Sequence, residues 1–157
     1  MTDVEPSAGR TPTGQTDAEP SHAEPKTPPS LHGVMPYLTV RGGKAALDFY
    51  ARAFDAIEFS RMPADDGERV LNSHLGINGG SIMLSDDFPE YRGPGELAPP
   101  SGVVLHLQVD DADRWFARAV EAGCTVKMPL ADQFWDDRYG QVADPFGQTW
   151  SIAHALK

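Results

Sequence analysis

An internal repeat is the feature of this sequence that most constrains its fold. Residues 49–56 (FYARAFDA) align with residues 115–122 (WFARAVEA), and four of these eight positions are identical. The elements predicted around the two segments follow in the same order, so a tandem duplication explains the agreement better than chance similarity. Duplications of this kind commonly pair into one pseudo-symmetric structure, which restricts the fold to two copies of one unit.

Hydrophobic periodicity defines that unit. Apolar residues at helical spacing predict helices over residues 42–53 and 112–122. Alternation and turn signals predict strands over residues 34–40, 57–62, 70–77 and 81–85, and again over 103–109, 125–129, 139–143 and 149–153. The chain therefore contains two βαβββ repeats, residues 34–85 and 103–153, joined by a linker over residues 86–102. The predicted class is α+β, with the repeats forming a curled mixed sheet around a cleft and the helices on its outer face.

The first thirty residues differ in composition from the rest of the chain. Residues 1–30 contain six prolines and no aromatic residue. Such a segment cannot bury enough apolar surface to offset its ordering entropy, so we predict a disordered tail followed by a single domain over residues 31–157. The sequence shows neither the basic start and apolar run of a signal peptide nor a window that could span a membrane. We therefore expect a cytoplasmic protein with no membrane partner.

The charge and the cysteine content argue against several classes of function. The formal net charge is −10 at pH 7, and an acidic domain repels phosphate backbones, so nucleic acid is not an expected partner. A cationic ligand would be favoured, although an acidic surface often serves solubility alone. The single cysteine, Cys124, cannot form an internal disulfide. Its place between a predicted helix and strand favours a small buried hydrophobe over a nucleophile.

Alternation within the strands separates a core face from an opposite face. The opening strand of each repeat carries apolar residues that predict a helix-covered core, namely Val34, Leu38 and Val40, and Val103, Leu105, Leu107 and Val109. The interleaved residues point the other way. This places Tyr37 and His106 at equivalent positions in the two repeats, with Gln108 beside His106. The alternative for His106 is a packed core histidine.

The other strands add residues to the face opposite the core. In the last strands, Met83 and Ser151 fall on it. In the third strand, Leu71, Leu75 and Ile77 are assigned to the core and His74 to the opposite face, where it could equally be tied to a backbone carbonyl. Aligning Gly79 with Gly147 places Arg138 on the same face as His74. Small and polar residues mixed with Tyr, His and Met suit the inside of a ligand cleft.

Trp135 completes the predicted ligand site. It precedes a turn, where an exposed indole would be costly without a partner, so a pocket lid or a dimer contact is expected. The predicted ligand-binding residues are therefore Tyr37, His74, Met83, His106, Gln108, Trp135, Arg138 and Ser151. No catalytic residue is identified.

The βαβββ duplication and the closing motif DPFGxxW, residues 144–150, resemble the glyoxalase, bleomycin-resistance and dioxygenase group, the vicinal oxygen chelate superfamily. The resemblance covers residues 34–153. The run DQFWxxRYG, residues 132–140, is similar more narrowly to the PhnB-like branch. Paired modules of this kind imply a homodimer. The scaffold carries isomerases, ring-cleaving dioxygenases, fosfomycin-modifying enzymes and drug-sequestering proteins, so it does not specify an activity.

The resemblance also implies where a metal ion would bind. Enzymes of the superfamily hold a divalent ion through one position in each first and each fourth strand, and these positions carry Met35, Met83, Val104 and Ser151. None of these side chains suits a hard or borderline divalent cation. We therefore predict a metal-independent small-molecule-binding protein with no cofactor.

Two alternatives remain open at this point. The first is an enzyme, either a metal-dependent lyase, isomerase or dioxygenase with a displaced site built from His74, His106 and Asp86, or one that uses His106 as a general base with Arg138 stabilising an oxyanion. The second is a drug-sequestering resistance protein, because acidity and aromatic residues would suit a cationic drug.

Overall fold

The computed structural model describes residues 31–157, and the predicted disordered tail lies outside the described residues. The first half contains β1 (Tyr37–Val40), α1 (Gly43–Phe54), β2 (Ile57–Pro63), β3 (Val70–Ile77) and β4 (Gly80–Asp86). The linker contains α2 (Pro89–Arg92). The second half contains β5 (Leu105–Gln108), α3 (Ala112–Ala122), β6 (Thr125–Asp132), β7 (Asp137–Ala143) and β8 (Thr149–Ala155). The α+β class and the tandem βαβββ order are thus confirmed.

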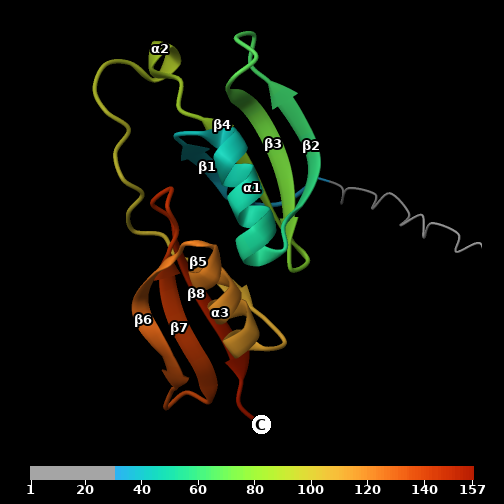
Figure 1. Cartoon of the computed structure of the whole chain (residues 1–157), viewed down its shortest axis with the longest axis vertical. Helices are drawn as coiled ribbons and strands as arrows, with labels where there is room; N and C mark the ends of the chain where they lie inside the picture. Colours follow the sequence, from blue (N-terminus) through green and yellow to red (C-terminus); the bar gives the residue numbers. More distant parts are fainter. Residues whose placement is uncertain (1–30) are drawn as a thin grey trace, which may run out of the picture.

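The two repeats form two open four-stranded sheets with the same topology. Their strand orders are β1-β4-β3-β2 and β5-β8-β7-β6, and in each sheet the first strand runs parallel to the last. The halves are stacked along the long axis, each with its helix across one face of its sheet, and the linker runs along the outside (Figure 1). Among residues 31–157, no helix is long and apolar enough to cross a membrane.

Both opening strands are shorter than the sequence pattern predicts. Val34 and Val103, assigned above to the core, have exposed fractions of 103% and 68%. Pro36 has no N–H to donate and only accepts, from Met83 N at 2.9 Å, so the regular pairing of β1 begins at Tyr37. In the second half, β5 pairs with β8, which begins only at Thr149. The assignment of Leu71 to the core is also wrong, because this side chain is 41% exposed.

One hydrophobic core spans both repeats. Its centre is an aromatic cluster in which Tyr50 and Phe54 of α1 meet Trp150 of β8, with ring centroids 5.7 Å and 4.4 Å apart. All three side chains are at most 2% exposed. Aromatic side chains contribute more buried area than other residues, so this cluster ties the two halves together.

The residues that are identical in the two repeats lie where the helices meet. Arg118 of α3 donates from Nε to the carbonyl oxygen of Ala53 at 3.1 Å, and Arg52 of α1 donates from Nη1 to that of Ala122 at 3.5 Å. Each helix thus satisfies a carbonyl at the end of the other. The fully buried Ala53 and Ala119 lie in the same contact region. The repeated arginines are structural, which accounts for the FYARAFDA and WFARAVEA similarity.

Asp144 of the DPFG motif is a second link between the repeats. Its buried carboxylate accepts hydrogen bonds from the Tyr50 hydroxyl at 2.8 Å and from Trp150 Nε1 at 2.9 Å. It also accepts from the backbone N–H groups of Phe146 and Gln148, both at 2.9 Å. The motif therefore closes the β7–β8 turn and holds α1 of the first repeat at the same time.

Candidate functional site

The helix-free face of the second sheet carries a hydrogen-bonded cluster around His106. Its Nδ1 lies 2.8 Å from the Ser151 hydroxyl and its Nε2 lies 2.9 Å from Gln108 Oε1. An amide oxygen only accepts, so Nε2 carries the proton and donates to Gln108. In the neutral ring, Nδ1 then accepts from Ser151. Three of the predicted ligand-binding residues therefore form one chain of hydrogen bonds.

A row of aromatic side chains continues from this cluster to the tip of the β6–β7 hairpin. The rings of His106 and Tyr139 are stacked at 6.4 Å, and Tyr139 meets Trp135 edge-on at 5.7 Å. Trp135 in turn contacts Phe134 at 4.9 Å. The two side chains at the tip are exposed, Trp135 by 43% and Phe134 by 93%. Trp135 thus lies beside the predicted site, where its role as a lid or dimer contact stays a prediction.

The helix-free face of the first sheet carries the other predicted residues. Met83 lies between Tyr37 of β1 and His74 of β3 in the strand register. The Tyr37 hydroxyl accepts a hydrogen bond from Asn72 at 2.8 Å. His74 is 3% exposed, and its Nε2 lies 3.0 Å from the Ser81 hydroxyl. The partner of His74 is therefore a side chain on the same face.

A hollow of about 500 Å³ lies between the two repeats and is lined by both of them. Its polar lining includes Ser81, His106 and Gln108. Its apolar lining comprises Pro36, Ile77, Ile82, Val103, Val104, Leu105, Leu107 and Trp150. At its edge Asn78 donates to the Gln108 carbonyl at 2.7 Å. Its size and its few polar groups within an apolar wall are typical of ligand pockets. We call it the junction hollow.

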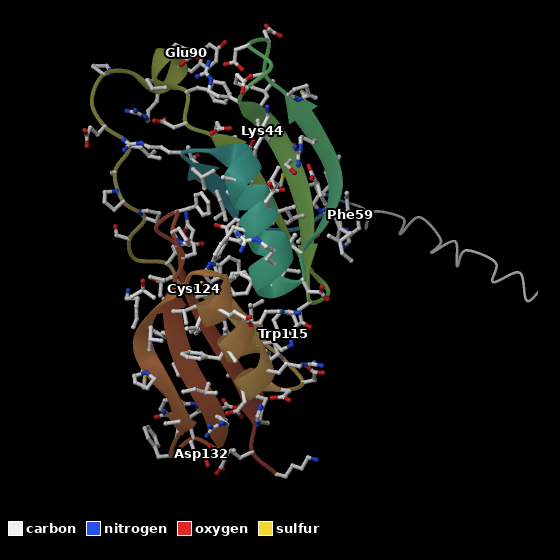
Figure 2. All side chains as sticks on the ribbon, in the orientation of Figure 1. Lys44, Phe59, Glu90, Trp115, Cys124 and Asp132 are labelled. Atoms are coloured by element: carbon white, nitrogen blue, oxygen red, sulfur yellow. The ribbon has the colours of Figure 1, made fainter. Side chains whose placement is uncertain are left out.

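Arg138 does not lie on the predicted face. It donates to Asp113 of α3 from Nε at 2.6 Å and to Asp132 from Nη1 at 2.8 Å, so it points to the helix-bearing side. Asp132 marks the end of the second repeat that is remote from the first (Figure 2). The hydrogen bonds from Arg138 lower the pKa of Asp113. The prediction that Arg138 shares the face of His74 is therefore wrong.

The length of one turn explains the error. Four residues lie between the paired positions Gly76 and Ser81 at the β3–β4 turn. Five residues lie between the equivalent pair, Ala143 and Thr149, at the β7–β8 turn. One extra residue shifts the alignment along β7 by one position and exchanges the two faces of the strand. The same shift brings Tyr139 and Gln141 onto the helix-free face, which the sequence alignment missed. Their side chains are joined by a 2.7 Å hydrogen bond.

The side chains at the inherited metal positions do not fit a divalent cation. Met83 and Met35 offer thioethers, Val104 offers a hydrocarbon, and the Ser151 hydroxyl is bonded to His106. Hard and borderline divalent cations take carboxylate, imidazole or thiolate ligands instead.

The displaced metal site is not assembled either. Asp86 accepts three backbone N–H groups, from Gly42, Gly43 and Val70, at 2.7–2.9 Å. It thereby caps α1, whose N-cap residue Gly42 has no side chain to do so. Within residues 31–157, no three His, Cys, Asp or Glu side chains are grouped closely enough to hold a metal ion.

Comparison with known proteins identifies relatives of the whole folded part. The family model described as the Glyoxalase/Bleomycin resistance protein/Dioxygenase superfamily matches residues 20–152. The Mycobacterium tuberculosis protein Rv0887c is 41% identical over 156 residues, which cover 97% of this chain and 87% of that protein.

Solved structures agree with this match. The structure of the Arabidopsis thaliana gene product At5g48480 is 31% identical, with a TM-score of 0.61, and the match covers 78% of this chain and 98% of that chain. A PhnB protein from Bacillus cereus, titled a putative 3-demethylubiquinone-9 3-methyltransferase, has a TM-score of 0.60 at 20% identity. That match covers 79% of this chain and all of the other, and it shows a common fold.

Proposed function

Because the chain belongs to the glyoxalase/bleomycin resistance protein/dioxygenase superfamily, we propose that it is a small-molecule-binding protein whose ligand occupies the junction hollow. The observation that carries this proposal is the hollow itself, about 500 Å³ in volume, with His106 and Gln108 in its wall. We also propose that binding needs no metal ion or other cofactor. The side chains at Met35, Met83, Val104 and Ser151 support this part of the proposal.

The chemistry of the site favours a neutral or cationic ligand with a planar aromatic part. Arg138, the cation expected here, is engaged by two aspartates on the other face. The polar side chains that line the hollow are instead Ser81, Asn78, Gln108 and His106, with no lysine, arginine or acidic residue among them. The aromatic row that ends at Trp135 offers ring faces next to them. These features also favour a second candidate function, sequestration of a cationic aromatic drug.

Replacing His106 tests the ligand site. We expect His106→Ala to weaken binding of a planar cationic probe such as proflavine by about 1–3 kcal/mol, because one polar contact is lost. The free energy of unfolding should change little, since the side chain is exposed to solvent. Fluorescence titration and urea unfolding of the same variant measure the two quantities.

Arg138→Ala is the matched control for this experiment, because Arg138 is bonded on the other face. Its affinity for the probe should stay within about twofold of the parent. Binding that is unchanged in His106→Ala, together with a loss of stability, would mark His106 as a packing residue and contradict the proposed site.

We further propose that the protein is a homodimer, in which a second copy covers the open sheet faces. Tyr37 is 51% exposed on the helix-free face of the first sheet. Trp135 and Phe134, at the tip of the β6–β7 hairpin of the second sheet, are 43% and 93% exposed. Aromatic side chains are enriched at protein interfaces relative to the rest of the surface, and contiguous exposed apolar patches mark such interfaces. We expect sedimentation at about 10 µM to give a species of twice the 17.0 kDa chain mass.

The double variant Phe134→Ser/Trp135→Ser should raise the dimer dissociation constant by at least about tenfold. Tyr91→Ser is the control, because Tyr91 is an 82% exposed aromatic residue in the linker helix α2. A species of 17.0 kDa alone in the parent protein would overturn the dimer proposal.

A further inference from the structure

A second hollow, of about 420 Å³, also adjoins the β3–β4 turn. It is lined by Asp55, Ile57, Phe59, Gly76, Asn78, Gly79, Gly80 and Trp115. It shares only Asn78 and Gly80 with the lining of the junction hollow. Trp115 lies beneath the lower end of α1, and Phe59 projects from β2 (Figure 2). We call this space the Trp115 hollow.

The pseudo-symmetry of the repeats gives the Trp115 hollow a counterpart. Trp115 of α3 corresponds to Phe49 of α1 in the repeated octapeptide. The arginine three residues later covers the ring in both cases, Arg118 at 4.6 Å from the Trp115 centroid and Arg52 at 5.8 Å from that of Phe49. Each aromatic ring is therefore covered by an arginine of its own helix.

The two settings differ in the turn that faces the ring. Gly79 and Gly147 are equivalent glycines with φ of 82° and 93°. The residue before Gly147 is Phe146, whose ring packs edge-on against Phe49 at 5.8 Å. The residue before Gly79 is Asn78, whose amide instead donates to the Gln108 carbonyl. The turn of the first repeat thus leaves a hollow beside Trp115. At the equivalent place, the turn of the second repeat packs the Phe146 ring against Phe49.

We propose that the Trp115 hollow binds a small aromatic amine, with its phenyl-sized ring beside Trp115 in the place that Phe146 takes in the other repeat. Phe59 supplies a second aromatic wall. It lies so close to Gly76 that a Cβ there would be 2.6 Å from Phe59 Cε2, so any larger residue at position 76 would displace the Phe59 ring. Offset and edge-on ring contacts of this kind stabilise an aromatic ligand beyond the area it buries.

Asp55 specifies the charge of the ligand. It ends α1 in a left-handed conformation, with φ of 53°, and its exposed side chain lines the hollow. Within residues 31–157 its carboxylate makes no ion pair with Lys, Arg or His. An ammonium group on the ligand would supply that partner, whereas a carboxylate on the ligand would be repelled.

Three probes that share a phenyl ring and differ in charge test the proposal by NMR titration: benzylamine, benzyl alcohol and benzoate. We expect benzylamine to shift the Trp115 indole resonance saturably and to bind at least about threefold more tightly than benzyl alcohol, with benzoate weakest. Asp55→Asn should remove the preference for the amine and leave benzyl alcohol binding unchanged. Ile57→Trp, which fills the hollow, should weaken all binding at least about tenfold.

His106→Ala separates this site from the proposed function, because His106 lines the junction hollow and does not line the Trp115 hollow. Benzylamine binding should be unchanged in that variant even if the junction hollow binds nothing. The proposal is overturned if benzylamine does not saturate, if His106→Ala abolishes its binding, or if Asp55→Asn retains the full preference for the amine. Because Asp55 is exposed, Asp55→Asn should fold and still test the preference for the amine even if Ile57→Trp does not fold.

Discussion

Asp144→Asn should lower the free energy of unfolding by about 3 kcal/mol, which for a domain of this size lowers the melting temperature by roughly 6–12 °C. The asparagine oxygen can still accept from the backbone N–H groups of Phe146 and Gln148. Its amide nitrogen, however, replaces the oxygen that accepts from Tyr50 and Trp150. The indole N–H of Trp150 is a donor only, so two buried donors then face each other.

Urea unfolding followed by circular dichroism measures this loss. Tyr50→Phe removes one of the four hydrogen bonds and should cost less, about 1 kcal/mol. Asp65→Asn, at an exposed position, is the control and should change stability by no more than about 0.5 kcal/mol. A loss below about 1 kcal/mol in Asp144→Asn would contradict the role assigned to the carboxylate. Because Asp144 joins both repeats, we also propose that residues 31–157 unfold as one domain, in a single transition.

The sequence predicted the repeat unit well where local signals mark the ends of an element. Helix α3 has the predicted bounds because the Asp111 side chain caps it, accepting from Arg114 N at 3.1 Å, and Gly123 ends it. The bounds of β3 were also predicted correctly. The strands β1 and β5 were predicted too long because apolar character alone does not show whether a neighbouring strand is present to pair with.

The candidate site was harder to predict, because it depends on register and on distant partners. The face of Arg138 depends on one extra residue in the β7–β8 turn, which an alignment on glycine does not count. The DPFG motif indicates a turn, but nothing in it shows that Asp144 is bonded to Tyr50, 94 positions away. By contrast, His106, Gln108 and Ser151 were placed on one face correctly, because strict alternation along β5 and β8 specifies that face.

Raising the pH from about 8 to about 10.5 should cost the protein about 3 kcal/mol of stability through two groups beside Asp144. Burial, followed by the Asp144 charge, raises the pKa of Cys124 from 9.0 to about 12. Burial, followed by the same charge and hydrogen bond, raises the pKa of Tyr50 far above its usual value of 10.0. Both side chains are at most 6% exposed, so solvent screens these effects only weakly.

Stability falls with rising pH because the folded protein holds these protons more tightly than the unfolded chain does. Above about pH 9 the unfolded chain releases protons from cysteine and then tyrosine, whereas the folded protein keeps them. Stability is therefore fully present below that pH and is lost as the pH rises towards 12. At pH 10.5, Cys124 contributes about 2 kcal/mol of the loss and Tyr50 about 1 kcal/mol.

Urea midpoints at the two pH values, measured under reducing conditions, test this prediction. Cys124→Ala removes one titrating group, and the Cys124→Ala/Tyr50→Phe double variant removes both. Each variant should therefore lose less unfolding free energy between about pH 8 and about pH 10.5 than the parent, although each is less stable than the parent at pH 8. Tyr91→Phe, at an 82% exposed tyrosine, is the matched control and should leave the loss unchanged. An alkaline loss of the same size in the double variant would show that Cys124 and Tyr50 do not keep their protons in the folded state, and that the buried Asp144 network is more open to water than its geometry indicates.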